Sequence, residues 1–539
     1  MKWISLGLGV PLLSACAALY SADASLPTVR IDAAAILGHI EVLASDRFEG
    51  RMPGTAGAEL TVAYLQDTFK RYGLAPGNPD GTYLQEVTLA GVTSTMDVSI
   101  NVGGARVALQ PKVDYSGGSW QPRPSVSVRA SDLVFVGHGI VAPEYGWDDY
   151  KQMDMHGKTV VLLMSDLGFR PDRKTYYATG DYKRRFAAQR GAAACITVHE
   201  IDRAGGTPFS AYASQFGAEN LVLAQNADSE CPAEMVITIE RARDLFNRAG
   251  LDFDRLHDGA RSKDFIPVVL DATADIDIRS TLRTIRTHNV VARVEGSDPR
   301  LKDDVVVYTA HWDHLGRVPN GAPDQIYHGA LDNASGTAAI LEIAHAFATA
   351  TQRPRRSVLF IATTAEEAGL LGAKHYVTHP LFPLARTVAD LNFDLVNAWG
   401  RTEDFQITGF GESSLDDVLR NVAAEQGRRV IPDQTPELMT YYRVDSFEFA
   451  RSGIPSVYFG AGIDYIGKPP QYRKEKLGAY FANDYHRVTD TVRADWDLSG
   501  AAEQALFGFG VGWRLTEGRP FPQWRPGTEF KATRDAMLK

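Results

Sequence analysis

The stretch VVVYTAHWDHLG, residues 305–316, determines how the rest of the sequence is interpreted. Residues 305–310 form a short apolar run rich in β-branched side chains, which predicts a fully buried strand. The run ends in His311, Asp313 and His314. Polar and charged side chains cost free energy when they are buried without partners, so nothing in the strand itself explains them. The cluster therefore predicts partner groups from elsewhere in the chain.

The region from about residue 285 alternates strand-like and helix-like segments. Strand patterns are NVVARVEG, VVVYTAH, SVLFIATTAEE, VADLNFD and IPSVYFG, and helical patterns cover residues 335–350 and 369–378. This alternation predicts an α/β fold with a mainly parallel, mixed sheet flanked by helices. In such sheets, ligands bind at the carboxyl ends of the strands. We therefore expect the functional site at that edge.

Acidic and imidazole side chains follow several of these strands. Glu366 and Glu367 follow SVLFIATTA, and Asp394 follows VADLNF. Two loops add Asp332, just before a helix in HGALDNASG, and His486 in DYHRVTDT. Each has an ordinary structural explanation, such as a helix N-cap for Asp332 or an acidic helix start for the glutamates. Their coincidence at one sheet edge favours a common site.

Carboxylates and imidazoles without thiolates suit zinc, cobalt or manganese in a hydrolytic site. The candidate ligands are His311, Asp332, Glu367, Asp394 and His486. Five ligands are too many for one catalytic zinc that must keep an open position. Two metal ions fit better if one carboxylate bridges them, and such a pair acidifies a shared water and polarises a carbonyl or phosphoryl oxygen. Glu366 is then free for proton transfer.

Five segments together resemble a known family. AHWDH, GALDNASG, TAEEAGLLG, NFDLVN and DYHRVTDT are similar, in this order, to the metal-site segments of the dinuclear zinc aminopeptidases, a family that also holds glutamate carboxypeptidases and glutaminyl cyclases. The resemblance covers roughly residues 285–515. It implies two Zn²⁺ ions, one held by His311 and Asp394, the other by Glu367 and His486, with Asp332 as the bridge.

The same resemblance implies three further roles. Asp313 would orient the ring of His311 from behind. Glu366 would be the general base that activates the water and later protonates the leaving amine. Tyr485 would donate a hydrogen bond to the tetrahedral oxyanion.

The remaining chain divides into further parts by its sequence patterns. Helical patterns at residues 34–43 and 58–72 predict an N-terminal helical leader, residues 30–110, that packs on the catalytic domain. FVGHGIVAPEYGWDDY, MHGKTVVLLMSD and RRFAAQRGAAACITVH lie in a β-rich region, residues 115–280, which resembles the protease-associated domain often inserted into this family. The catalytic domain is expected at residues 285–520.

Residues 1–24 form a predicted signal segment. Residues 3–13 are apolar, long enough for a secretory signal core and too short for a permanent membrane span. LSAC, residues 13–16, resembles a lipoprotein cleavage box in which Cys16 is lipidated; cleavage after ADA, residues 22–24, is the alternative. We expect an exported protein, either a periplasmic or outer-membrane lipoprotein or a secreted one, with Cys16 as its sole membrane contact.

Composition excludes several other classes. The net charge of −10 and the lack of a basic run argue against a nucleic-acid partner. Cys195 and Cys231 suit a single bridge or two buried thiols, but neither has a CxxC partner for redox chemistry or zinc. No GxSxG nucleophile elbow occurs in the chain.

The sequence therefore predicts an exported metallopeptidase that acts on peptides, favouring an aminopeptidase. A carboxypeptidase is the alternative, because Arg443, Lys468 and Arg473 lie in segments that could bring a cation to a substrate carboxylate. A glutaminyl cyclase would need one zinc and usually lacks the inserted module. A receptor-like relative without catalysis would be expected to have lost its metal ligands, which are all present here.

Overall fold

The computed structural model describes residues 26–539 except 201–207, 226–229, 320, 323–324 and 518–519. The predicted signal segment, with Cys16 and both cleavage sites, lies outside the described residues. Among the described residues, no helix combines the length and the apolar character that a membrane span requires.

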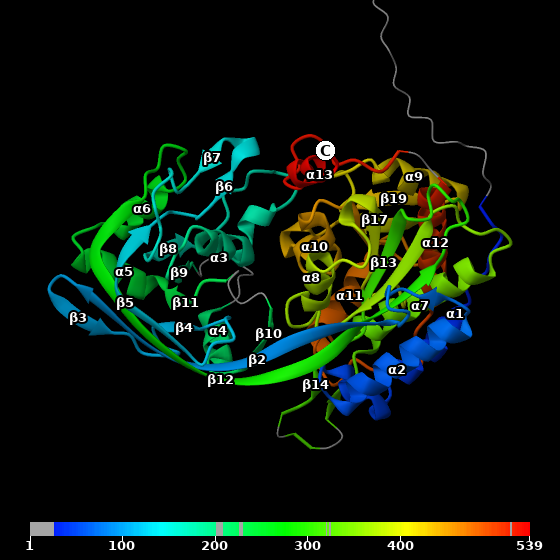
Figure 1. The fold of residues 1–539 in the computed structure, drawn as a ribbon, viewed down its shortest axis with the longest axis horizontal. Coiled ribbons are helices and arrows are strands. Elements are labelled where there is room, and N and C mark those ends of the chain that lie inside the picture. The colour runs from blue at the N-terminus through cyan, green and yellow to red at the C-terminus, as the bar shows by residue number, and fades with distance from the viewer. Residues whose placement is uncertain (1–25, 201–207, 226–229, 320, 323–324, 518–519) are drawn as a thin grey trace, which may run out of the picture.

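A 16-stranded mixed sheet runs through the described part of the chain (Figure 1). Its main path has the order β19-β18-β20-β17-β13-β16-β12-β5-β8-β9-β11-β4, and β1, β2, β3 and β10 join it at the side. The strands of its catalytic half are β13 (Val305–His311), β16 (Ser357–Thr363), β17 (Thr387–Phe393), β18 (Asp404–Thr408), β19 (Arg429–Pro432) and β20 (Ser456–Gly460). The predicted α/β fold with a mainly parallel, mixed sheet is confirmed.

The three strands that carry the predicted site residues are neighbours. β13 pairs in parallel with β16 on one side and with β17 on the other. All residues of β13 are buried, as the continuous apolar run predicted. Parallel neighbours place their carboxyl ends at one edge of the sheet. The polar residues that follow these strands therefore meet.

Helices cover both faces of this half of the sheet. On one face, Val306 and Tyr308 of β13 lie in a core with α7 (Ser335–Thr349), α9 (Leu415–Glu425) and α12 (Ser499–Glu517). On the other face, Val305 and Val307 pack with residues of α8 (Leu371–Thr378) and α10 (Ser446–Arg451). Successive side chains of the strand point to opposite faces of the sheet, so β13 contributes residues to both cores. The remaining helices here are α11 (Tyr472–Asn483) and α13 (Lys531–Met537).

The N-terminal segment is helical only in its first half. α1 (Ala33–Leu43) and α2 (Ala56–Arg71) pack against the catalytic half beside α7 (Figure 1). The second half, which we predicted as part of a helical leader, is instead β1 (Ala75–Pro76), β2 (Leu84–Val102) and β3 (Ala105–Ala108). Alternating buried and exposed positions along β2 explain the strand, because that period suits a sheet and not a helix.

The β-rich region contains β4 (Tyr115–Gly118), β5 (Ser125–Phe135), β8 (Thr159–Leu163), β9 (Ala194–His199), β10 (Glu219–Leu223) and β11 (Ala233–Thr238), together with α3 (Gly180–Gln189), α4 (Phe209–Gln215), α5 (Ile239–Arg248) and α6 (Phe253–Gly259). It has its own apolar core, which includes Phe135, Ile196 and Phe246. Cys195 and Cys231 are both buried and unbridged. The strand β12 (Val268–Val294) continues from this region into the catalytic half, so one long strand crosses the expected boundary near residue 280 (Figure 1).

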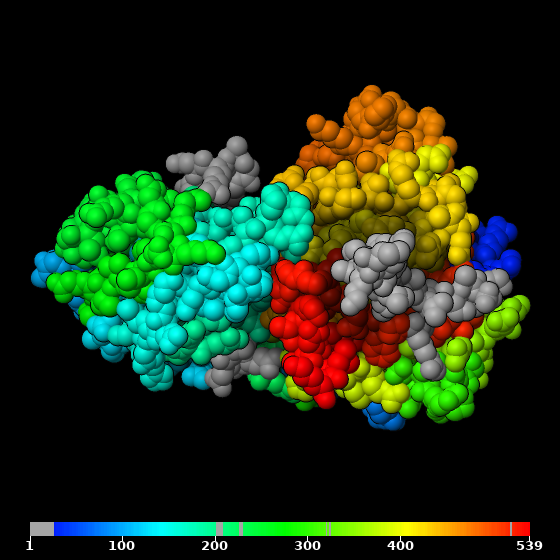
Figure 2. All heavy atoms as spheres, turned by 90° about the horizontal axis from the view of Figure 1, so that it is seen from above, coloured from blue at the N-terminus to red at the C-terminus, as the bar shows by residue number. Residues whose placement is uncertain are grey.

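A buried ion cluster also joins the two halves. Arg173, in the loop before α3, donates hydrogen bonds to Glu412 and to Glu529 at 2.8 to 3.2 Å. Figure 2 shows the C-terminal segment, drawn in red, against the cyan part of the chain on this side of the molecule. The loop before α3 is therefore fixed to the catalytic half by charge as well as by the sheet.

Candidate metal centre

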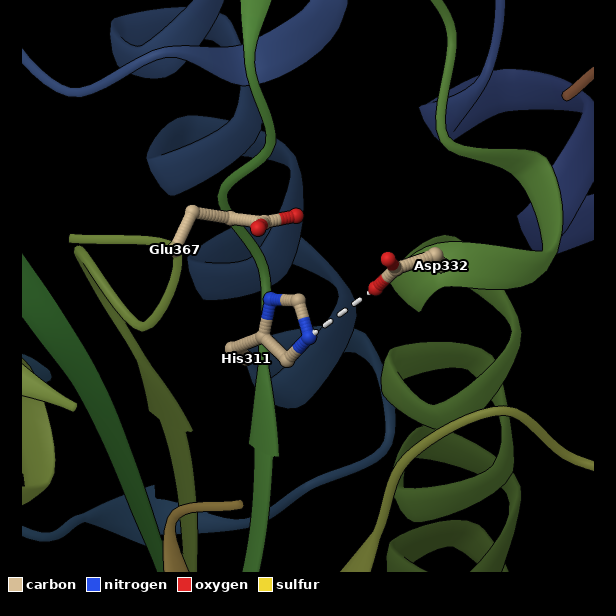
Figure 3. A group of neighbouring side chains, drawn as sticks. All are labelled: His311, Asp332 and Glu367. Atoms are coloured by element: carbon tan, nitrogen blue, oxygen red, sulfur yellow. Dashed lines mark ion pairs between the residues drawn. The ribbon is translucent and has the colours of Figure 1, made fainter. Parts of the chain in front are cut away.

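Three strand ends and two loops deliver the site residues. His311 is the last residue of β13, Glu367 lies in the turn after β16, and Asp394 directly follows β17. Asp332 lies in the turn before α7, and His486 follows α11. Figure 3 shows the ring of His311 directed toward Asp332, with the carboxylate of Glu367 close by. Ligand atoms of these three residues lie within 4.8 Å of one another.

The carboxylate of Asp332 lies between the two histidines. Its Oδ1 is 3.3 Å from His311 Nε2, and its Oδ2 is 3.1 Å from His486 Nε2. Each oxygen of Asp332 thus faces a different imidazole. This is the arrangement that a bridging carboxylate requires.

Each histidine faces a second carboxylate as well. Asp394 Oδ1 lies 3.6 Å from His311 Nε2, and Glu367 Oε2 lies 3.1 Å from His486 Nε2. The five side chains thus form two groups, each with one imidazole and one carboxylate, that share Asp332. This grouping is the same as the one implied by the family resemblance.

The donor set fits metal ions. His311 Nε2, His486 Nε2 and Asp394 Oδ1 are buried atoms that make no hydrogen bond. Buried polar atoms are normally hydrogen-bonded, and those that are not often mark a bound ion or water. Imidazole nitrogen and carboxylate oxygen are the ligands that zinc takes in hydrolytic sites. The residues present therefore suit two divalent ions.

Glu366 lies at the edge of this group. Its Oε2 is 3.8 Å from His311 Nε2, the same ring that faces Asp332 and Asp394. Burial raises the pKa of Glu366 well above its usual range, and the charge of neighbouring Glu367 adds to the rise, against the opposing effect of His311. Glu366 can therefore hold a proton.

Asp313 supports the site by a different contact from the one expected. His311 Nδ1 forms its hydrogen bond with the main-chain oxygen of Asp313, at 3.1 Å, and lies 3.8 Å from the carboxylate. The carboxylate instead accepts hydrogen bonds from the main-chain N–H groups of Glu366 and Glu367, at 3.0 and 3.4 Å. Asp313 thereby fixes both His311 and the turn that carries the two glutamates.

Two more residues belong to the site, and neither was assigned a role from the sequence. His314 is buried, and its Nδ1 lies 2.6 Å from Glu367 Oε1. Asp490 accepts the main-chain N–H groups of Leu331 and Asp332 at 3.0 and 3.1 Å. Both lie inside segments that carry the resemblance, AHWDH and DYHRVTDT, and that position was the available signal.

The electrostatics of the site favour a cation. Burial lowers the pKa of His486, but the neighbouring carboxylates of Asp332 and Glu367 raise it to about 10. Burial opposes ionisation of Asp332, yet the two imidazoles that flank it hold its pKa far below the usual range. Closely packed carboxylates that stabilise positive charge this strongly also favour divalent cations.

A pocket of about 300 Å³ opens beside the centre. Its lining includes Glu366, Glu367, His486, Tyr485 and Arg443. The ring of Tyr485 stacks on that of His486 with the centroids 3.9 Å apart, and its hydroxyl accepts a hydrogen bond from Arg443 Nη2 at 3.5 Å. Tyr485 therefore lies at the entrance to the centre.

Of the three basic residues suggested for binding a substrate carboxylate, Arg443 lines this pocket. Arg473 instead donates to Gln406 Oε1 at 3.0 Å, and the ammonium of Lys468 lies over the ring of Tyr472. Arg443 is therefore the one candidate of the three for such contact.

Part of the chain is similar to a known protein family. Residues 289–509 match the family model described as peptidase family M28, a match that covers less than half of the chain. The matched segment contains Glu366 and the five candidate ligands His311, Asp332, Glu367, Asp394 and His486.

Individual relatives are similar over parts of the chain. Leupeptin-inactivating enzyme 1 of Streptomyces exfoliatus is 29% identical over 285 residues, which are 51% of this chain and 59% of that enzyme. An aminopeptidase of Pseudomonas aeruginosa is 29% identical over 242 residues, 42% of this chain and 41% of that protein. The chain thus matches less than two thirds of the length of either relative.

Among solved structures, an aminopeptidase from Aneurinibacillus sp. strain AM-1 is similar to 91% of this chain and 95% of its own, with 20% identity and a TM-score of 0.46. A zinc aminopeptidase from Bacillus subtilis is similar to 91% of this chain and 97% of its own, with 18% identity and a TM-score of 0.43.

Proposed function

We propose that the protein is a metallopeptidase that hydrolyses peptide bonds with a water activated by two Zn²⁺ ions, and that it removes N-terminal residues. The observation that carries the proposal is the position of Asp332, whose two oxygens face His311 and His486 separately. The match of residues 289–509 to peptidase family M28 and the name of the Pseudomonas aeruginosa relative support the same activity.

In this proposal, His311 and Asp394 would hold one ion, Glu367 and His486 would hold the other, and Asp332 would contribute an oxygen to each. Cobalt or manganese would suit the same ligands. Bound there, the ions supply acidification of a water and polarisation of the scissile carbonyl. Asp313, His314 and Asp490 act indirectly, because they fix the main chain or the ring orientation of the ligands.

Glu366 moves the proton. Its carboxylate is buried, lines the pocket and is not needed as a ligand. Because its pKa is raised, Glu366 is suited to take a proton from the attacking water at Oε2 and to pass it to the leaving amine. The leaving amine becomes neutral and departs, while Glu366 returns to its ionised state.

The pocket suits a substrate with a free amino group. Glu366 lines it, and Asp394 lies beside the same ring of His311, so two carboxylates are available for a substrate ammonium. Tyr485 is placed to donate its phenolic hydrogen to the oxyanion that develops on the scissile carbonyl. Charge complementarity thus favours an aminopeptidase.

A carboxypeptidase is a second candidate, because Arg443 lines the same pocket. A guanidinium binds a terminal carboxylate well. The two activities separate in one assay, in which a peptide with a free amino group is compared with the same peptide after N-acetylation. Loss of turnover on acetylation supports the aminopeptidase, and equal turnover contradicts it.

We also propose that residues 115–280 are a protease-associated domain that limits what enters the site. Thr179 and Asp181, from this region, line the pocket together with the catalytic residues. The apolar residues 3–13 support export, with Cys16 as a lipid anchor. Cell fractionation and mass spectrometry of the mature N-terminus would test export and lipidation, and an unmodified N-terminus at Met1 would contradict both.

A further inference from the structure

Arg51 is a fully buried arginine, remote in sequence from the catalytic segment. It makes four hydrogen bonds, all to main-chain carbonyl oxygens. Its Nε donates to Trp312 at 2.8 Å, Nη1 to Leu43 at 2.7 Å and to His328 at 2.6 Å, and Nη2 to Gly329 at 2.9 Å. The charge is therefore solvated by oxygens of the main chain.

Three of these carbonyls, those of Trp312, His328 and Gly329, belong to the loops that carry metal ligands. Trp312 follows His311 directly and precedes Asp313, while Gly329 lies three residues before Asp332. One rigid, planar guanidinium thus contacts both loops at once. Because its donors are fixed relative to each other, the spacing of the two loops is fixed as well.

The segment that carries Arg51 is shaped for this contact. Glu49, Gly50 and Arg51 all have positive φ, at 50°, 71° and 54°. This conformation is unfavourable for Glu49 and Arg51, so the surroundings must hold it. Gly50 has no room for a side chain, since a Cβ there would lie 2.4 Å from the main-chain oxygen of Gly316. The turn is therefore pressed onto the loop that follows His314.

The charge of Arg51 also matters for the site. Burial lowers the pKa of Arg51 to about 10, which leaves it protonated at neutral pH, while Asp490, Asp313, Asp332 and Glu367 act in the opposite direction. A permanent cation near these carboxylates offsets part of their mutual repulsion. Arg51 thereby helps to keep these carboxylates close together before any metal ion binds.

We propose that Arg51 is a positioning residue for the metal centre: it holds the loops of His311 and Asp332 at the separation that metal binding requires. The inference rests on the proposed two-metal function. It makes the N-terminal segment part of the catalytic unit, since the segment supplies a cation that the M28-matched residues, 289–509, do not contain at this place.

The chain offers a matched control for the test. Arg534 is also fully buried, donates to main-chain oxygens of Leu384 and Thr387 at 3.1 and 2.8 Å, and has its pKa lowered to about 10. Arg534 lies in α13 and contacts Thr387, the first residue of β17, at the end of that strand opposite to Asp394. Arg51→Met and Arg534→Met therefore remove equivalent buried charges, one beside the metal centre and one away from it.

The experiment measures the Zn²⁺ affinity of metal-stripped full-length protein by competition with a chromophoric chelator, alongside thermal unfolding of the same samples. Both Met variants are expected to unfold at a lower temperature. Only Arg51→Met is expected to bind Zn²⁺ more weakly, by about 10- to 100-fold, as for other residues that orient metal ligands. After saturation with Zn²⁺, its kcat should fall more than its KM rises.

Arg51→Lys provides a second variant if Arg51→Met does not fold. The lysine keeps the charge but cannot contact both loops with a planar guanidinium. The Zn²⁺ affinity of Arg51→Lys should therefore be lower than that of wild type. Where Arg51→Met also folds, the affinity of Arg51→Lys should lie between those of wild type and Arg51→Met. Wild-type affinity in a folded Arg51 variant, or an equal loss in Arg534→Met, would overturn the inference. Wild-type protein that binds no Zn²⁺ would instead contradict the proposed function.

Discussion

His486 Nε2 lies 3.1 Å from Asp332 Oδ2, although Asp332 lies in the turn before α7 and His486 follows α11, far later in the chain. The other oxygen of Asp332 faces His311. The Nε2 atoms of both imidazoles make no hydrogen bond. Each oxygen of Asp332 can therefore bind one metal ion together with the histidine that it faces. Removal of this carboxylate should therefore affect both metal positions at once.

Asp332→Ala is expected to lose both metal ions and nearly all peptidase activity, since the bridge contributes a ligand to each ion. Metal content per chain should be measured by elemental analysis after gel filtration. Asp404→Ala is the control, because Asp404 is buried and accepts main-chain hydrogen bonds from Ile463 and Asp464 away from the centre. Full metal content in Asp332→Ala would show that Asp332 is not a ligand.

Glu366→Gln and Glu367→Gln should separate catalysis from metal binding. Glu366→Gln is expected to keep both ions and to lose kcat by about 10²- to 10⁴-fold, the usual contribution of a general base. Glu367→Gln, one residue away, should lose metal, because Glu367 Oε2 faces His486. Steady-state kinetics with metal analysis checks both. Undiminished kcat in Glu366→Gln would remove it as the base.

Arg443→Gln distinguishes the two peptidase classes. For an aminopeptidase, the substitution should change kcat/KM equally for a dipeptide and its C-terminal amide, because Arg443 acts there only through Tyr485. For a carboxypeptidase, the dipeptide alone should lose about 1.5–3 kcal/mol of binding, or about 10- to 150-fold. A loss confined to the free acid would therefore contradict the aminopeptidase.

Arg173→Met is expected to lower the free energy of unfolding by about 3–5 kcal/mol, since Glu529 would remain buried without its cation and Glu412 would keep only its longer contact with Arg170. Urea unfolding followed by fluorescence measures the change. Arg420→Met is the control, and because Arg420 and its partner Asp417 are both exposed, it should cost only about 0–1 kcal/mol. Equal effects would mean that the Arg173 cluster stabilises no more than a surface pair.

The sequence predicted the strand-end part of the site well, for a physical reason. Val305 to Ala310 could only be a buried strand, and His311 at its end needed partners. Parallel strands then placed Glu367 and Asp394 at the same edge. Asp332 and His486 lie in loops, whose positions follow from no local pattern. Their residue types made them candidates, and the family resemblance implied their roles as bridge and ligand.

Other features could not be predicted from local patterns. Arg51 lies in a turn-rich segment that looks solvent-exposed, and its burial depends on loops about 260 residues later in the chain. Residues 84–102 were assigned to a helical leader because the two helices before them were clear, and their pairing along β12 appears only in three dimensions. Contacts of this range carry no signal in a single sequence.

Two divalent ions are expected to bind around Asp332. Their presence can be measured by elemental analysis of purified, active protein before and after dialysis against a chelator. We predict close to two zinc, cobalt or manganese ions per chain, loss of activity with their removal, and recovery when Zn²⁺ is added back. Active protein without such ions, or activity that survives their complete removal, would contradict it.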